Sequence, residues 1–253
     1  MIEFCSLGSG SRGNALLARS HNSCVLIDCG FGPRELERRL AQRSMHPRDI
    51  DGILVTHEHS DHVGGVAAVA RRHGITVFAT AGTAKVARFD GLRVEVLLAE
   101  REVRVGDIDV LPVTVAHDAR EPCQFVLSHR SCRLGVLTDL GTVTPSVRAS
   151  YACCDALVLE ANHDPDMLAN GPYPWPLKQR VGGAYGHLSN SQAAVLLASV
   201  ERGALQHVVA AHLSEQNNAP ALARSALEGA LNGSAAQLHL ADQESGCEWL
   251  QIA

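Results

Sequence analysis

Hydrophobic residues in this chain cluster into short apolar runs divided by polar turns, and four stretches instead show helical spacing. Short apolar runs predict buried β-strands, whereas apolar residues three and four positions apart predict amphipathic helices. We expect helices at residues 35–43, 63–73, 189–201 and 219–231. We expect strands at residues 24–27, 53–55, 75–79, 92–97, 108–115, 124–127, 133–137, 156–159, 207–211, 237–240 and 248–252.

One stretch interrupts the regular pattern. Residues 164–186 hold four prolines and several glycines, and we interpret them as a long ordered loop, a kind of segment that often carries function. With no internal repeat and no linker, one domain over residues 1–253 is the simplest organisation. Two groups of strands with helices between them predict an α/β fold, an αββα sandwich of two sheets flanked by helices.

Composition narrows the class of protein. Hydrophobic residues make up 46% of the 253, enough for a large core, and the net charge of -5 argues against a protein that wraps a long duplex. The eight cysteines form no C-x-x-C pair and several lie in apolar runs, so we expect reduced thiols in a cytoplasmic protein. The chain begins without a basic, apolar leader and has no run of about 20 apolar residues. We therefore expect neither secretion nor a membrane span.

Histidine is over-represented, with 13 residues, and its positions indicate a metal site. Between an expected strand and an expected helix, His57, His59, Asp61 and His62 crowd into six residues. Neutral imidazoles suit Zn, Mn or Fe, and a carboxylate adds charge. The alternative, a solvated polar loop, does not explain so dense a pattern.

Other metal-capable residues directly follow apolar strands. His117, Asp139 and His212 each come after such a run, and Asp28 follows another. Any one alone would be an ordinary strand-end residue. Together with the histidine loop they predict side chains that converge on one rim of the sandwich.

These positions resemble the five ordered motifs of the metallo-β-lactamase superfamily over nearly the whole chain. The resemblance implies that His57, His59 and His117 hold one divalent metal ion, and that Asp61, His62 and His212 hold a second. It also implies that Asp139 bridges the two ions, which can be Zn, Mn or Fe. Asp28 would support a ligand from behind, although it could equally be a simple turn residue.

Further motifs resemble nucleases of the superfamily. The segments beginning at Glu160 and at His187 are similar to stretches of the tRNA-processing enzyme RNase Z. The patterns S-G-S-x-G-N, T-D-x-G, N-H-D, Y-P-x-x-L-K-x-R and H-L-S-x-x-N-N more closely resemble the bacterial YycJ/WalJ-like group of single-domain nucleases. The resemblance implies a DNA exonuclease that acts from the 5′ end. We find neither the tRNA-gripping arm of RNase Z nor room for the cap domain of the β-CASP nucleases.

A phosphate substrate also has support from local features. Ser189 and Gln192 form a capping box that opens a helix, with Asn190 in its first turn, and helix N-termini favour anions. Lys178 and Arg180 could hold a backbone phosphate, and Tyr173 or Trp175 could stack on a base. The alternative is a Pro-rich loop that packs these aromatic side chains on the body of the protein. Residues 9–14 could cradle phosphate with backbone N–H groups or could simply form a tight hairpin turn.

For the reaction, we expect two metals about 3.5–4 Å apart to activate a bridging water for attack on phosphorus. Asp61 would orient the water and accept its proton, and His187 would stabilise the phosphoryl oxygen or protonate the leaving oxygen. His163, near Glu160, is the competing proton donor. Three alternatives remain: a small-molecule hydrolase of the same fold, a redox di-iron protein and a non-catalytic metal-binding module.

Overall fold

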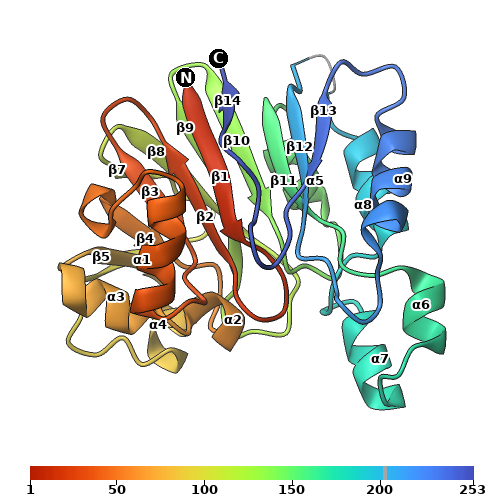
Figure 1. Cartoon of the computed structure of the whole chain (residues 1–253), viewed down its shortest axis with the longest axis horizontal. Helices are drawn as coiled ribbons and strands as arrows, with labels where there is room; N and C mark the ends of the chain where they lie inside the picture. Colours follow the sequence, from red (N-terminus) through yellow and green to blue (C-terminus); the bar gives the residue numbers. More distant parts are fainter. Residues whose placement is uncertain (202–203) are drawn as a thin grey trace.

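The structure, a computed structural model, describes residues 1–201 and 204–253, and these form two mixed β-sheets that face each other (Figure 1). Each sheet has seven strands among the described residues. The first sheet has the order β14-β1-β2-β3-β4-β5-β6. Its strands are β1 (Ile2–Gly8), β2 (Ala15–Arg19), β3 (Cys24–Ile27), β4 (Gly52–Leu54), β5 (Thr76–Thr80), β6 (Val94–Leu97) and β14 (Leu250–Ile252).

The second sheet repeats this design with the order β13-β12-β11-β10-β9-β8-β7. Its strands are β7 (Val103–Val105), β8 (Ile108–Thr114), β9 (Cys123–His129), β10 (Cys132–Leu137), β11 (Ala156–Glu160), β12 (His207–Ala211) and β13 (Gln237–Leu240).

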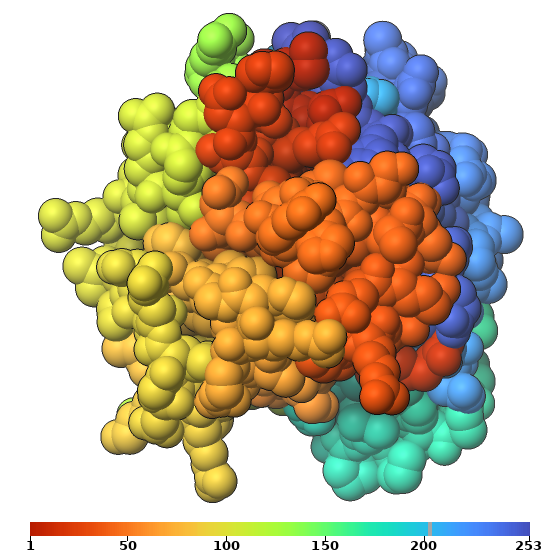
Figure 2. All heavy atoms as spheres, turned by 60° about the vertical axis from the view of Figure 1, so that its left-hand side comes forward, coloured from red at the N-terminus to blue at the C-terminus, as the bar shows by residue number. Residues whose placement is uncertain are grey.

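Helices cover the outer face of each sheet, which confirms the predicted αββα sandwich (Figure 1). On the side of the first sheet lie α1 (Pro33–Gln42), the 3-10 helix η1 (Pro47–Asp49), α2 (Ser60–Val63), α3 (Val66–His73) and α4 (Ala81–Val86). These helices form one continuous face, coloured orange in Figure 2. On the side of the second sheet lie α5 (Pro145–Tyr151), α8 (Asn190–Ala198) and α9 (Pro220–Ala230).

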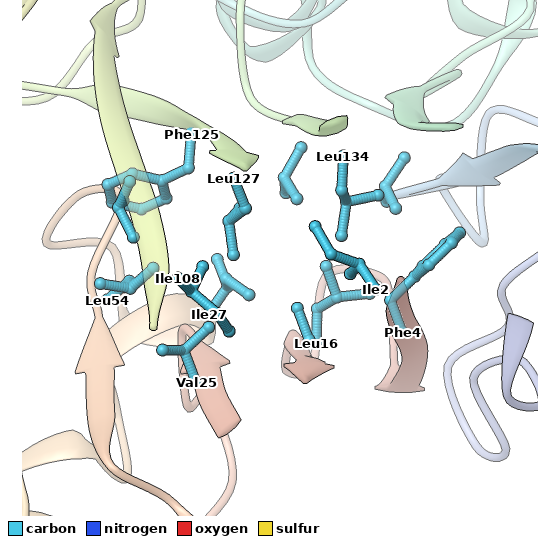
Figure 3. Close-up of a cluster of buried hydrophobic side chains, with 14 of the residues drawn as sticks. Ile2, Phe4, Leu16, Val25, Ile27, Leu54, Ile108, Phe125, Leu127 and Leu134 are labelled. Carbon is cyan, nitrogen blue, oxygen red and sulfur yellow. The ribbon is translucent and has the colours of Figure 1, made fainter. Parts of the chain in front are cut away.

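The main core lies between the two sheets. Ile2, Phe4, Leu16 and Ile27 of the first sheet point toward Phe125 and neighbouring residues of the second (Figure 3). These side chains are 0–6% exposed, and burying such a side chain stabilises the fold by about 1.5–3 kcal/mol. Separate apolar clusters fill the layers between each sheet and its helices. The core therefore makes the sandwich rigid, which leaves the strand ends free to carry chemistry.

The strand directions bring the predicted ligands to one edge. Strands β3 to β6 are parallel to one another, and so are β10 to β13. Strand β8 runs in the same direction as β10, because both are antiparallel to β9. The loops that follow β3, β4, β8, β10, β11 and β12 consequently meet at one rim, as expected where strand carboxyl ends converge.

Residues 164–186 depart from the prediction of an irregular loop. They contain α6 (Pro165–Asn170) and α7 (Trp175–Val181), which project together beyond the sheets (Figure 1). Both helices carry proline in the first turn, where the missing N–H costs nothing and the fixed φ favours a helix. The prolines that suggested a loop therefore start helices. The expected helix at 63–73 is likewise divided, because Gly64 and Gly65 separate α2 from α3.

The cysteines agree with the expectation of reduced thiols. All eight are free in the described chain, and six of them are buried. Within residues 1–201 and 204–253, no helix combines the length and apolar character that crossing a lipid bilayer requires.

Candidate metal centre

Three imidazoles form the first ligand group at the rim. His57 and His59 lie in the loop between β4 and α2, and His117 follows β8. Nδ1 of His59 is 3.0 Å from Nε2 of His57 and 3.3 Å from Nε2 of His117. Nδ1 of His117 is 3.0 Å from the carbonyl oxygen of Gly186, to which it can donate a hydrogen bond. This hydrogen bond leaves Nε2 without a proton and able to bind a metal.

The second group combines two imidazoles with a carboxylate. Oδ2 of Asp61 is 3.3 Å from Nε2 of His62 and 3.4 Å from Nε2 of His212. Asp139 lies against the same imidazoles, with its Oδ2 at 3.3 Å from His62 and its Oδ1 at 3.4 Å from His212. Ligand atoms of His57, His62 and Asp139 also lie within 4.8 Å of one another. Asp139 therefore stands between the two groups.

These separations fit metal ions. Ligands at about 2.0–2.1 Å from a tetrahedral metal lie about 3.3–3.4 Å from each other, which matches the distances in the second group and the 3.3 Å between His59 and His117; the 3.0 Å between His57 and His59 is shorter. The same distances exceed those of good charge-assisted hydrogen bonds. Oδ2 of Asp139 is buried and has no hydrogen-bond partner in the described part of the chain, because its contact with His62 lacks hydrogen-bond geometry. A buried carboxylate oxygen that lacks a partner is costly unless an ion binds it.

Asp28 holds the second group from behind. Its Oδ2 accepts from Oγ1 of Thr56 at 2.7 Å and lies 2.7 Å from Nδ1 of His62, and its Oδ1 accepts the backbone N–H of Thr56 at 2.8 Å. Asp28 is 3% exposed, so water does not compete for these bonds. A proton fixed on Nδ1 of His62 leaves Nε2 free to face the metal-binding atoms.

Burial and charge give the two groups different protonation. Burial, followed by the neighbouring His62, lowers the pKa of His57, and burial lowers the pKa of His117. Burial alone would also lower the pKa of His212, but Asp139 and Asp61 raise it to about 9. His57 and His117 therefore favour the neutral form, which binds metals, whereas His212 favours a proton that a bound cation would replace.

His187 and Glu160 form a dyad beside the second group. Oε1 of Glu160 lies 2.7 Å from Nδ1 of His187, and its Oε2 accepts backbone N–H groups of Leu188 and Leu140. The imidazole of His187 stacks on that of His212 with 5.3 Å between ring centroids. Burial would lower the pKa of His187, but Glu160 raises it. This arrangement directs Nε2 of His187 to the pocket.

A pocket of about 350 Å³ opens above the two groups. His59, Asp61, Asp139, His187 and His212 line it, so these five of the predicted catalytic and metal-binding side chains reach one space. His163 does not line the pocket, and it is 4% exposed with no partner for Nδ1 in the described part of the chain. The structure thus brings His187, and not His163, to the pocket.

Of the side chains expected to contact phosphate, only Arg180 lies at the pocket in the described chain. Ser189 and Asn190 are 4% and 3% exposed; Ser189 completes the capping box of α8 and Asn190 pairs with Asn218. They lie behind the pocket and are not available to a phosphate. Nζ of Lys178 donates to the carbonyl of Ala169 and also lies outside the pocket, whereas Arg180 lines it.

Residues 9–14 support the ligands. Oγ of Ser9 accepts the backbone N–H of His212 at 2.8 Å, and Nδ2 of Asn14 donates to Oδ2 of Asp61 at 3.2 Å. The backbone N–H of Gly10 donates to Oδ1 of Asn14, and that of Arg12 donates to Gln243. These donors are therefore occupied within the protein, and the segment positions the ligands of the second group.

Asp118 is the functional candidate that the sequence analysis missed. Its Oδ1 is 3.5 Å from Nε2 of His117 and 3.8 Å from Nε2 of His59, and its Oδ2 accepts from Nε of Arg180. The sequence signal was its position directly after a predicted ligand.

Comparison with known proteins decides the family. A family model described as the beta-lactamase superfamily domain matches residues 23–212. The chain is also 33% identical over 252 residues to the exodeoxyribonuclease YycJ of Bacillus anthracis, a match that covers 95% of this chain and 96% of that protein. The chain belongs to the metallo-β-lactamase superfamily. This membership confirms the predicted fold and the predicted class of metal-dependent hydrolase.

Other members of the metallo-β-lactamase superfamily agree with this assignment. The exodeoxyribonuclease WalJ of Streptococcus pneumoniae is 31% identical over 229 residues, which cover 88% of this chain and 85% of that protein. Among solved structures, the metallo-β-lactamase fold protein YhfI of Bacillus subtilis superposes with a TM-score of 0.76 at 14% identity, covering 98% of each chain. The short form of human tRNase Z superposes with a TM-score of 0.67 at 16% identity, covering 99% of each chain. These two likenesses show the fold alone.

Proposed function

We propose that this chain is an exodeoxyribonuclease that uses two divalent metal ions to hydrolyse DNA from the 5′ end. The observation that carries the proposal is the pair of ligand groups joined by Asp139, with ligand atoms 3.3–3.4 Å apart in the second group. Support for DNA as the substrate comes from the curated relatives. They are exodeoxyribonucleases, and the chain aligns with them over most of their length. The 5′ polarity rests on the motif resemblance alone.

The ligand set defines what each group would hold. His57, His59 and His117 would bind one ion, and Asp61, His62 and His212 would bind the other, with Asp139 shared between them. Zn, Mn and Fe all suit this mixture of imidazole and carboxylate ligands. When bound, two such ions lower the pKa of a water and neutralise charge on the reacting phosphoryl group.

The side chains of the pocket supply the proton transfers. The carboxylate of Asp61 is 21% exposed and borders the pocket, so it can orient the attacking water and accept its proton. Nε2 of His187, with the opposite ring nitrogen held by Glu160, can donate to the phosphoryl oxygen or to the leaving oxygen. We further propose that the chain works as one domain in the cytoplasm, because residues of both sheets build one site and the cysteines are free.

A nuclease assay tests this proposal directly. Purified protein with added Mn²⁺ or Zn²⁺ is incubated with single- and double-stranded DNA and RNA labelled at either end, beside a His59→Ala variant. We expect mononucleotides released from the 5′ end of DNA, and no release by the variant. Absence of cleavage of every polymer, with metals bound, would contradict the proposal and would redirect the search to a small phosphodiester or thioester of pocket size.

A further inference from the structure

The metal centre does not account for the ion pair between Asp118 and Arg180 at the wall of the pocket. Arg180 lies in the last turn of α7 and its side chain is 56% exposed. Nε donates to Oδ2 of Asp118, and the two terminal nitrogens have no partner in residues 1–201 or 204–253. An arginine held through Nε keeps its planar fork available for an anion.

Asp118 is itself held firmly. Its backbone N–H donates to the carbonyl of Tyr185 at 2.9 Å, and the other carboxylate oxygen faces Nε2 of His117 and of His59. The carboxylate thus lies between the guanidinium and the imidazoles of the first ligand group. Among the described residues, no hydrogen bond or ion pair joins Arg180 to a predicted metal-binding side chain, and Asp118 lies between them.

The bond between Arg180 and Asp118 matters because α7, the helix that carries Arg180, is weakly held by packing. None of the seven described residues of α7 is buried, so apolar packing does little to fix the position of the helix. Trp175 at its start is 70% exposed and does not pack on the body of the protein. Elements with few buried apolar contacts have low local stability. Two bonds tie the end of α7 to the rim of the metal centre: the backbone N–H of His187 donates to the carbonyl of Val181 at 2.8 Å, and the side chain of Arg180 donates to Asp118.

We propose that Asp118 is a positioning residue that orients Arg180 to bind the phosphate next to the scissile one. This inference rests on the proposed nuclease function and deepens it, because it names the feature that distinguishes a polynucleotide from a small phosphodiester. A small diester has no second phosphate, so it gains nothing from Arg180. The pair therefore raises the selectivity of the pocket for a polymer.

The test compares two substrates for each variant: a labelled DNA oligonucleotide and bis(p-nitrophenyl) phosphate. The ratio of their kcat/KM values cancels differences in the metal-loaded fraction. We expect Arg180→Gln and Asp118→Ala to lower the DNA-to-diester ratio by roughly 10- to 100-fold, the effect of one hydrogen-bonded charge. Both should reduce the dependence of the KM for DNA on salt by about one phosphate contact.

Further variants separate positioning from a structural role. Asp118→Asn retains an oxygen that can accept from Nε and should recover part of the ratio, whereas Arg180→Lys should not, because an ammonium cannot bond Asp118 and present a fork. The double variant Asp118→Ala with Arg180→Gln should be no worse than Arg180→Gln alone. The matched control is Arg104→Gln, which removes an exposed ion pair with Asp109 in the β7–β8 hairpin and should leave the ratio unchanged.

Each contrary result has its own meaning. An unchanged ratio in Arg180→Gln, or additive losses in the double variant, would overturn the inference while the nuclease function stands. Improved DNA cleavage by Asp118→Ala would show that Asp118 only repels the substrate. Wild-type protein that cleaves the small diester and no DNA would instead refute the proposed function, and this inference with it.

Discussion

Replacing Asp28 by Asn tests how strongly the metal centre depends on a residue that touches no substrate. The change is isosteric, and Asn, like Asp, tolerates the left-handed backbone of this position, where φ is 58°. It replaces one carboxylate oxygen with an NH₂ group. If that group occupies the place of Oδ2, it faces Oγ1 of Thr56 and Nδ1 of His62, which both lie 2.7 Å from Oδ2 in the native protein.

The expected size of the effect follows from these contacts. A donor placed against Nδ1 makes Nδ1 the acceptor and moves the imidazole proton to Nε2, the atom that faces Asp61 and Asp139. A protonated nitrogen cannot bind a metal, so the tautomer must be reversed before binding. Loss of such a supporting contact lowers metal affinity by about 10- to 100-fold, which corresponds to about 1.4–2.7 kcal/mol.

The assay is a competition titration of metal-free protein against a chromophoric chelator, with Zn²⁺ as the probe. The matched control is Asp90→Asn, because Asp90 is exposed and lies away from the rim. We expect Asp28→Asn to bind the ion of the second group, held by Asp61, His62 and His212, more weakly than the wild type does. The control should bind both ions with wild-type affinity. Wild-type affinity for both ions in Asp28→Asn would refute the reasoning, because it would show that the tautomer of His62 does not depend on Asp28.

Three further predictions concern stability. Arg39→Met should lower the free energy of unfolding by about 1–3 kcal/mol in urea titrations, because Arg39 is 5% exposed and its Nη1 donates to the carbonyls of Leu7, Gln243 and Glu244, which the change leaves without that donor. A loss below about 0.5 kcal/mol would contradict this. Gly65→Ala should lower the free energy of unfolding by about 1–3 kcal/mol or more, because its Cβ would lie 1.8 Å from the carbonyl oxygen of Phe31. Its control, Gly229→Ala, places a Cβ in open space and should raise the free energy of unfolding by about 0.5 kcal/mol. Removal of metal with EDTA should lower the unfolding midpoint in calorimetry, by an amount equivalent to about 2.7 kcal/mol if the wild type is held at a hundred times Kd, and added Zn²⁺ should restore it.

The meeting of the candidate metal ligands at one rim could be predicted because each candidate lies where the sequence pattern changes sharply. A buried strand has an apolar run, and a histidine or aspartate directly after it stands out, as at His117, Asp139 and His212. Parallel strands then bring such positions to one edge without further information. Local pattern and strand topology together were therefore sufficient to predict which side chains meet at the rim.

The missed features depend on tertiary contacts instead. Helices α6 and α7 escaped prediction because their prolines read as breaks, and no apolar stripe marks α7, which has no buried residue among those described. Ser189 has the chemistry of an anion site, yet its hydroxyl accepts the N–H of Gln192 within the capping box, and the N–H of Asn190 donates to the carbonyl of His163. Asp118 became a candidate only once Arg180, 62 residues away, was seen to contact it.

The backbone at the rim explains how strands that are straight elsewhere deliver ligands to a shared point. Among non-glycine residues in the described chain, seven have positive φ, and three of them are Asp28, Asp139 and His212, at φ of 58°, 53° and 54°. Asp28 and His212 directly follow β3 and β12, and Asp139 follows β10 after one intervening residue, Thr138. A left-handed residue at that point ends the extended strand and redirects the side chain, at a cost of roughly 1–2 kcal/mol for an L-amino acid.

Such strain persists only where surrounding contacts over-determine it. Here the contacts of Asp28 with Thr56, of Asp139 with His62, and of His212 with Ser9 provide that constraint. The strain and the hydrogen-bond network are therefore two parts of one arrangement, which orders the ligands before any ion arrives.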